Sequence, residues 1–469
     1  MKAKHKKTIC FLQAGLMALG LGFGAVGCDE KSDGGGNNTP KTYSDVIPTY
    51  AALTDPMTQG FHTSLFGDPY QQTVEAYKTI KDCGFRYVQL DGWFGTSFNS
   101  QGLVNALNAC DANDLKAVIM IDNNHEEGWE PYSFLEHATI DYKQFPAFYG
   151  YYAFDEPNRT QFDWVKQEMD RWEASEYKDY AFTLTMMGGD GTSDRDTFLT
   201  EYCEKVLKHS DYKVLQYDAY PLWAENGDKT MPYIGKGMLD ILEYMARYAK
   251  KYDSDLYAFL QTTEYSNGAA RAMEGAHDVR FQVATYLAYG AKGFPCFTYV
   301  SMPNAGFGNA MIEADGTIYP TYYYVQEVFQ ELFDWEHVYM DFEWNGTITK
   351  LGQNRAQYGS QDESHITSLS FSLESHDRIK EIKNENDLLV GTFEDSKGYD
   401  GFLITSCTDP YYRKSNEIEI EFNEASKALI YHNGKLVTTD EAETYYALQD
   451  GKLVWELEAG DYLFVIPVK

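Results

Sequence analysis

Short apolar runs alternate with helical stretches through most of the chain. Between about residues 60 and 300, each apolar run leads into a polar or glycine-rich loop and then into apolar positions at helical spacing. Strands that alternate with helices predict a parallel sheet, and eight such units predict a (β/α)8 barrel. A doubly wound open sheet is the alternative, although the polar and aromatic residues beyond nearly every strand favour the barrel. The predicted strands are Gly60–Leu65, Arg86–Leu90, Ala117–Ile121, Gly150–Phe154, Ala181–Met186, Lys213–Tyr217, Leu256–Gln261 and Gly293–Tyr299.

After about residue 340 the pattern changes to short alternating runs, which are typical of antiparallel strands. Asn433-Gly434 and Asp450-Gly451 are typical hairpin turns between such runs. The length of this segment suits one small β-sandwich. The sequence therefore predicts an α/β protein in which a (β/α)8 TIM barrel, residues 46–340, is followed by an antiparallel β-sandwich, residues 341–469.

The N-terminus has the pattern of a secretion signal. Several lysines precede an uncharged stretch, Ile9–Gly27, which ends in small residues before Cys28. This junction resembles a bacterial lipobox, which implies that residues 1–27 are a lipoprotein signal peptide and that lipidated Cys28 anchors the protein to a membrane. Residues 28–45 are then a flexible linker, and the protein lies in the bacterial cell envelope, facing the periplasm or the outside. Simple secretion and a retained membrane anchor are the alternatives.

Composition excludes several classes of function. Asp and Glu number 71 against 39 Lys and Arg, so the net charge of −32 repels a phosphate backbone and predicts no nucleic-acid partner. The C-x-x-C, H-E-x-x-H, P-loop and G-x-S-x-G motifs are missing from the sequence, so we expect no metal and no cofactor. Aromatic residues make up 16% of the chain, more than a core needs, and such rings often stack on sugars.

Polar residues cluster where the predicted strands end. In a barrel these ends meet at one face, where active sites lie. Carboxylates gathered there can raise the pKa of one acid while a neighbour stays ionised, which is the arrangement that glycoside hydrolysis uses. The polar and aromatic residues that follow the strands include Asp68, Asp91, Trp93, Asn123, His125, Asp155, Glu156, Asp218, Tyr220, Trp223 and Glu264.

The run from Gly150 to Asn158, with sequence GYYAFDEPN, resembles the end of strand 4 in the (β/α)8 glycoside hydrolases of clan A, including bacterial β-galactosidase-like enzymes. That family has its acid/base Glu at the end of strand 4 and its nucleophile Glu at the end of strand 7. The resemblance implies that Glu156 is the acid/base and Glu264 the nucleophile of a retaining mechanism, with the carboxyls about 5–5.5 Å apart. Asp155 stands where the family usually has Asn, and Glu274 is a second candidate nucleophile.

The remaining candidates are expected to bind the carbohydrate substrate. Asp218 and Tyr220 are expected to hydrogen-bond sugar hydroxyls or to tune Glu264, and the tryptophans can stack on sugar rings. The expected substrate-binding residues are Asp91, Trp93, Asn123, His125, Asp155, Asp218, Tyr220 and Trp223.

Other functions stay open alongside this prediction. The Asp155-Glu156 pair also suits a substrate-assisted hexosaminidase, in which Asp155 orients the substrate's acetamido group, Glu156 acts as acid and Glu264 is dispensable. A carbohydrate-binding lipoprotein without catalysis and an enzyme of another class are further alternatives, because a fold does not fix chemistry. The preferred prediction is a lipid-anchored glycoside hydrolase that cleaves O-glycosidic bonds of extracellular oligo- or polysaccharides.

Overall fold

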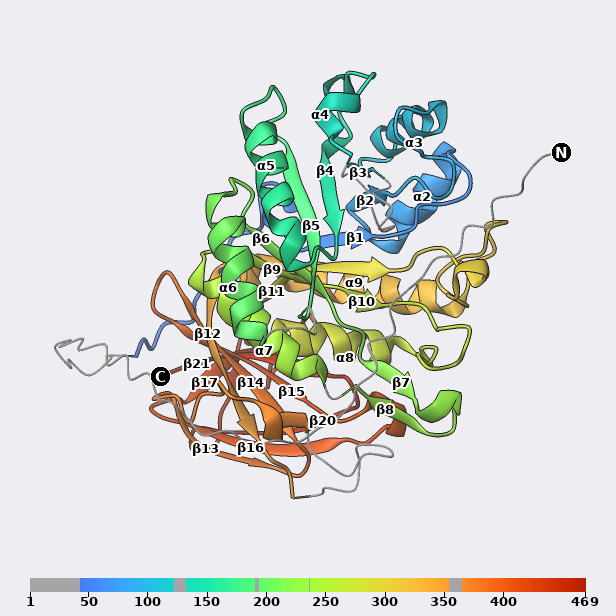
Figure 1. Cartoon of the computed structure of the whole chain (residues 1–469). Helices are drawn as coiled ribbons and strands as arrows, with labels where there is room; N and C mark the ends of the chain where they lie inside the picture. Colours follow the sequence, from blue (N-terminus) through green and yellow to red (C-terminus); the bar gives the residue numbers. More distant parts are fainter. Residues whose placement is uncertain (1–42, 122–131, 190–193, 236, 354–364) are drawn as a thin grey trace.

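The computed structural model describes residues 43–121, 132–189, 194–235, 237–353 and 365–469 (Figure 1). The predicted signal peptide, Cys28 and most of the predicted linker lie outside these residues. Eight parallel strands close into a barrel, because β1 pairs with β11 as well as with β2. This closure confirms the barrel and rules out an open sheet. The barrel strands are β1 (His62–Leu65), β2 (Tyr87–Leu90), β3 (Lys116–Met120), β4 (Phe148–Asp155), β5 (Ala181–Met187), β6 (Val214–Asp218), β9 (Asp255–Ala258) and β11 (Ala291–Phe297).

One predicted strand is divided. The run Leu256–Gln261 was expected to be continuous, but it forms β9 and then β10 (Leu260–Gln261), which pairs with β11. Between β6 and β9 the chain also forms a hairpin of β7 (Leu222–Ala224) and β8 (Pro232–Ile234). The hairpin and the segment after β10 therefore extend beyond the barrel strands.

Most of the helices alternate with the barrel strands and bury apolar side chains in the core that they share with the barrel. Helix α2, for example, begins at the Thr73 side chain, which accepts a hydrogen bond from Ala76 N, and ends at Gly84 with a φ of 102°. In the part of the chain that the structure describes, no helix is long and apolar enough to cross a membrane. The helices are α1 (Pro56–Gln59), α2 (Val74–Cys83), α3 (Gln101–Asp111), α4 (Phe134–His137), α5 (Phe162–Glu173), α6 (Arg195–Lys205), α7 (Gly237–Lys251), α8 (Ala276–Leu287) and α9 (Pro320–Tyr339).

The C-terminal part forms two antiparallel sheets that pack face to face. Val390 and Ile404 of the larger sheet share a core with Ile420 and Leu453 of the smaller sheet, which confirms the predicted sandwich. The larger sheet contains β12 (Phe342–Lys350), β14 (Leu388–Asp395), β15 (Asp400–Ser406), β21 (Tyr462–Val468), β17 (Lys427–His432), β18 (Lys435–Val437) and β19 (Tyr446–Ala447). The smaller sheet contains β13 (Ile379–Asn384), β16 (Asn416–Phe422) and β20 (Lys452–Leu457).

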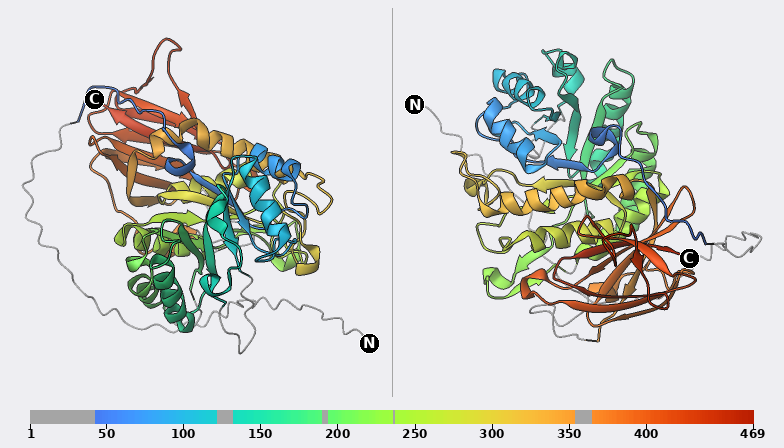
Figure 2. Two further views of the ribbon diagram at one scale, coloured as in Figure 1. Left: turned by 90° about the horizontal axis from the view of Figure 1, so that it is seen from above. Right: turned by 180° about the vertical axis from the view of Figure 1, so that it is seen from behind.

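The other face of the larger sheet packs on the barrel helices (Figure 2). Trp335 of α9 is fully buried and lies 5.2 Å from Phe464 and 5.8 Å from Tyr462 between ring centroids. Its indole N–H donates to the Tyr462 hydroxyl at 3.1 Å. One apolar core therefore runs from the barrel helices into the C-terminal sheet.

Candidate active site

The end of β4 brings two consecutive carboxyl groups together. Asp155 is the last residue of the strand, and Glu156 has a φ of 50°, a left-handed conformation that is uncommon for a residue other than glycine. The Glu156 amide donates to the Thr185 carbonyl at 2.9 Å, which holds this bend against β5. Consecutive strand residues normally point to opposite faces, so the bend explains how both acids reach one cluster.

Asp155 belongs to a hydrogen-bonded chain inside the barrel. The Tyr152 hydroxyl lies 2.6 Å from Asp155 Oδ1 and 2.6 Å from Thr185 Oγ1, and Gln216 Nε2 donates to Thr185 Oγ1 at 2.8 Å. The pairing of β4 with β5 shifts register between Tyr152 and Phe154, which lets Tyr152 and Asp155 meet although they are three residues apart. Tyr152 was not among the predicted site residues, because a bulge leaves no signal in the alternation of apolar positions.

Glu156 has a raised pKa, as expected of a general acid. Burial, together with the negative charge of Asp155, raises its pKa from 4.5 to about 7. Asp218, at the end of β6, shares a hydrogen bond with Glu156, and burial and the charge of Glu156 raise the pKa of Asp218 well above its usual range. Both carboxyls therefore stay protonated to a higher pH than ordinary acids, and they titrate as a coupled pair. Asp218 thus contacts Glu156, a partner that the sequence did not predict for it.

Glu264 occupies the segment that follows β10. Its side chain is 11% exposed, and it accepts hydrogen bonds from Lys229 Nζ at 2.7 Å and from Asn309 Nδ2 at 2.6 Å. The Glu264 carbonyl accepts from the Gly308 amide at 2.8 Å, so the segment that supplies Asn309 also holds the backbone of Glu264. Lys229 comes from the β7–β8 hairpin, and neither it nor Asn309 directly follows a predicted strand, so neither was among the predicted site residues.

A tyrosine connects the two parts of the site. Tyr265, next to Glu264, has a pKa raised to about 12 by burial and by the charges of Asp218 and Glu156. The charges of Asp218 and Glu156 also contribute to raising the pKa of Tyr220. The structure therefore groups Glu156, Asp218 and Tyr220 with the residue beside Glu264.

Aromatic side chains lie on the loops that follow several of the barrel strands. Trp93 packs edge-on against Phe66 at 5.6 Å, and Trp223 packs edge-on against Tyr265 at 5.8 Å, between ring centroids. Trp93, Trp223, Tyr220 and Tyr265 are all partly exposed. Partly exposed aromatic rings of this kind can stack on the C–H groups of sugars.

Asp91 is fully buried. Its Oδ1 accepts from the Trp93 amide at 2.9 Å, and its carboxyl shares a hydrogen bond with Asp68, which is also fully buried. Burial raises the pKa of Asp91 to about 6, and burial and Asp91 raise the pKa of Asp68 well above its usual range. Asp91 therefore supports the Trp93 loop, and its contact with substrate stays a prediction.

Asn123 and His125 lie outside the described residues, so their predicted contact with substrate also stays a prediction. Within the described ranges, His, Cys, Asp and Glu side chains nowhere gather in a group of three that could hold a metal ion.

Comparison with known proteins gives likeness in fold alone. No protein-family model and no curated protein matches the chain. The solved structures that it resembles include glycoside hydrolases. The β-galactosidase from the psychrophilic Marinomonas ef1 is 11% identical, covers 58% of this chain and 59% of its own length, and has a TM-score of 0.44.

Two further structures have similar values. The glycoside hydrolase family 30 subfamily 8 xylanase Xyn30A from Clostridium acetobutylicum is 10% identical over 87% of this chain and 96% of its own, with a TM-score of 0.41. GH5_18 from Streptomyces cattleya, in complex with GlcNAc, is 11% identical over 58% of this chain and 80% of its own, with a TM-score of 0.38. At these sequence identities and TM-scores the likeness says nothing about activity, so any argument about activity depends on the geometry of the site.

Proposed function

We propose that this protein is a glycoside hydrolase in which Glu156 is the general acid/base. The observation that carries the proposal is the position of Glu156 at the carboxyl end of β4, the barrel face where active sites lie, beside Asp155 and in a hydrogen bond with Asp218. Burial and the charge of Asp155 raise its pKa there to about 7. A glycosidic oxygen leaves only when it is protonated, and an acid with this pKa still holds a proton at neutral pH. An ordinary surface Glu would be ionised there.

The surrounding residues suit both halves of the reaction. Protonated Glu156 gives its proton to the departing oxygen, and the resulting carboxylate then accepts a hydrogen bond from Asp218, whose raised pKa keeps it protonated. In the second half Glu156 removes a proton from the incoming water. Asp218 thereby makes the loss and recovery of one proton at Glu156 less costly.

Glu264 is the proposed nucleophile of a retaining mechanism. It is mostly buried and forms an ion pair with Lys229 at 2.7 Å. The next residue is Tyr265, whose pKa is raised by burial and by the charges of Asp218 and Glu156. Attack by its carboxylate on the anomeric carbon forms a glycosyl ester as the bond to the protonated oxygen breaks, and water then hydrolyses the ester. The partly exposed aromatic rings favour an oligo- or polysaccharide substrate.

A substrate-assisted hexosaminidase is the second candidate. The observation in its favour is the bend at Glu156, which allows both Asp155 and Glu156 to reach one site. In this mechanism the substrate's acetamido oxygen attacks the anomeric carbon, Asp155 orients the acetamido group and Glu156 protonates the leaving oxygen. Glu264 would then take no part in bond formation.

The test is sugar release from a panel of oligo- and polysaccharides by the soluble chain that begins after Cys28. We expect release by the parent, and at least a thousandfold slower turnover by Glu156→Gln with glycan affinity retained. The control is Asp163→Asn, which removes an exposed acid of α5 and should act like the parent. If the parent releases no sugar from the panel while a glycan binds both proteins, the function is carbohydrate binding and the enzymatic proposal is wrong.

Lipid anchoring is a separate part of the proposal. We expect the full chain, expressed in bacteria, to lose residues 1–27, to carry lipid on Cys28 and to sediment with membranes. Cys28→Ser should remain in the soluble fraction or keep its N-terminal segment. Mass spectrometry of the N-terminal peptide decides between lipidation, simple secretion and a retained anchor.

A further inference from the structure

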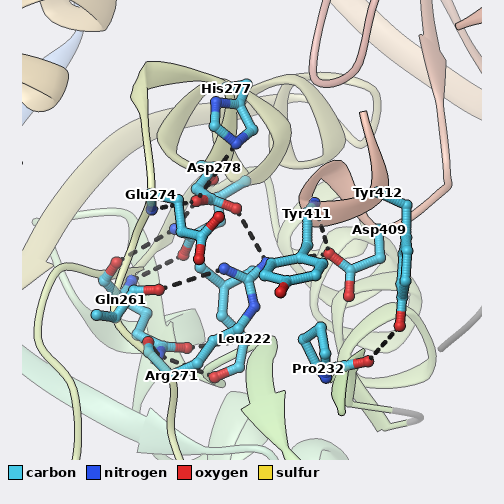
Figure 3. Close-up of polar contacts among 12 residues, drawn as sticks. Leu222, Pro232, Gln261, Arg271, Glu274, His277, Asp278, Asp409, Tyr411 and Tyr412 are labelled. Carbon is cyan, nitrogen blue, oxygen red and sulfur yellow. Dashed lines mark hydrogen bonds and ion pairs between the residues drawn. The ribbon is translucent and has the colours of Figure 1, made fainter. Parts of the chain in front are cut away.

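A short segment of the C-terminal sandwich lies against the loops that carry the proposed nucleophile and its partners (Figure 3). This segment is Asp409 with the 3-10 turn Pro410–Tyr412. Asp409 Oδ1 accepts from Arg271 Nη2 at 3.0 Å, and the Tyr412 hydroxyl donates to the Pro232 carbonyl at 3.2 Å. Arg271 belongs to the loop after β10, and Pro232 begins β8, so the sandwich contacts both loops.

The two loops are also joined to each other. The Gln261 side-chain amide accepts from Leu222 N at 2.8 Å and donates to Leu222 O at 3.0 Å and to Arg271 O at 3.2 Å. The Arg271 amide donates to Leu222 O at 3.1 Å, and Trp223 forms an antiparallel bridge with Ala270. The loop after β10 therefore adds to the β7–β8 hairpin, and the Lys229–Glu264 ion pair links the hairpin connection to the start of the same loop.

Buried charge fixes the far end of this loop. Arg271 is 3% exposed and also donates to Asp278 Oδ1 of α8 at 2.9 Å. Asp278 Oδ2 accepts from the Glu274 amide at 2.7 Å, so the last turn of the loop is held at the start of α8. Breaking one side of a buried ion pair is costly, and an arrangement of this kind favours one conformation of the loop over others.

We infer that Arg271 and Asp409 are positioning residues, through which the sandwich holds the loop of residues 262–275 in the conformation that presents Glu264. The catalytic consequence rests on the proposed function, whereas the effect on the loop does not. The sandwich is then part of the active-site architecture.

The test removes the Arg271–Asp409 contact and leaves Arg271 paired with Asp278. In Asp409→Ala, Arg271 keeps its bond to Asp278, so the chain retains a balanced ion pair. We expect amide hydrogen exchange in residues 262–275 to become about tenfold faster, with β4 unchanged. We also expect kcat to fall about ten- to hundredfold with KM within about twofold, because displacement of a catalytic group mainly affects the chemical step. The pH at which activity falls on the basic side should stay the same, since Glu156 is not displaced.

Three further variants make the result specific. Asp409→Asn keeps an oxygen acceptor for Arg271 and should restore most of the protection and of kcat. Tyr412→Phe removes only the bond to Pro232 and serves if Asp409→Ala does not fold. Asp395→Ala is the control, because Asp395 is a buried acid of the sandwich that accepts from Tyr50 and from nearby amides. It should change neither the exchange of residues 262–275 nor kcat.

Unchanged exchange of residues 262–275 in both Asp409→Ala and Tyr412→Phe would overturn the inference. Faster exchange with unchanged kcat would overturn its catalytic part. If the parent protein shows no turnover at all, the proposed function fails, and the exchange measurement alone still decides whether the sandwich holds the loop.

Discussion

Replacement of Asp155 by Asn separates the two catalytic mechanisms and tests the electrostatic argument for Glu156. Asn has nearly the same shape and can still accept the hydrogen bond that the Tyr152 hydroxyl donates to Asp155 at 2.6 Å. The variant therefore removes the negative charge with little change in geometry. In a retaining enzyme it should stay active, whereas in a substrate-assisted enzyme it should lose turnover.

The magnitude follows from the causes of the shift at Glu156. Its pKa rises from 4.5 to about 7, with burial as the larger cause and the charge of Asp155 as the second. Removal of that charge should therefore lower the pKa of Glu156 by about one pH unit, while burial still holds it above its ordinary value. Because a general acid is active only while protonated, activity should begin to fall about one pH unit lower in Asp155→Asn than in the parent.

The assay is the pH dependence of kcat/KM, which reports groups of the free enzyme. Since Glu156 and Asp218 titrate as a coupled pair, the basic limb reports both carboxyls, and the charge of Asp155 raises the pKa of each. Titration of 13C-labelled Glu side chains, with Glu156→Gln to assign the signal, gives the same pKa without turnover. Asp163→Asn is the control and should leave the profile unchanged.

An unchanged or higher basic limb in Asp155→Asn, confirmed by the carbon titration, would refute the electrostatic argument. A complete loss of turnover with glycan affinity retained would instead favour the substrate-assisted mechanism over the retaining one.

Three more outcomes follow from the site. Glu264→Gln should lower kcat at least a thousandfold, whereas Glu274→Gln, in the same loop, should keep kcat within about threefold of the parent value. Steady-state kinetics that show the reverse would identify Glu274 as the nucleophile. Asp68→Asn should make stability less dependent on pH, and its amide can still donate to Asp91. In the parent, the raised pKa values of these acids stabilise the fold at low pH, and this stabilisation is lost as pH rises through about 6 and above. The melting temperature of the parent should therefore fall over about pH 5–8 more steeply than that of the variant. Trp223→Ala should raise KM about tenfold, or about 1.4 kcal/mol, with a smaller change in kcat, and an unchanged KM on the best glycan of the panel would show that this ring does not stack on substrate.

The fold could be predicted because it depends on patterns that the sequence displays directly. Apolar runs followed by helical spacing located all the barrel strands, and seven of the eight begin and end within two residues of the predicted limits. The break in the seventh, at Phe259, was not predictable, because apolar residues continue through it. The turn residues Asn433-Gly434 and Asp450-Gly451 have the positive φ values that their residue types favour.

Site residues that directly follow a strand could be predicted, whereas those in the longer connections could not. Glu156 and Asp218 lie at strand ends, so barrel geometry brings them together. Lys229 and Asn309 reach Glu264 from long connections whose path has no periodic signal. The pairing of Asp218 with Glu156 depends on a backbone bend at one residue, which a pattern of residue types cannot reveal.

Every residue of β15 and β21 is buried, because one face of the larger sheet meets the smaller sheet and the other meets the barrel helices. A sheet that is covered on both faces is not an independently folding domain that can be removed by cutting the chain at a linker. A chain ending after Tyr339 would leave the apolar side of α9 without its cover, and a separate sandwich would expose the matching face of the sheet. We therefore expect the two parts to fold as one unit, and comparison of related sequences should show changes at Trp335 accompanied by changes at Tyr462 and Phe464.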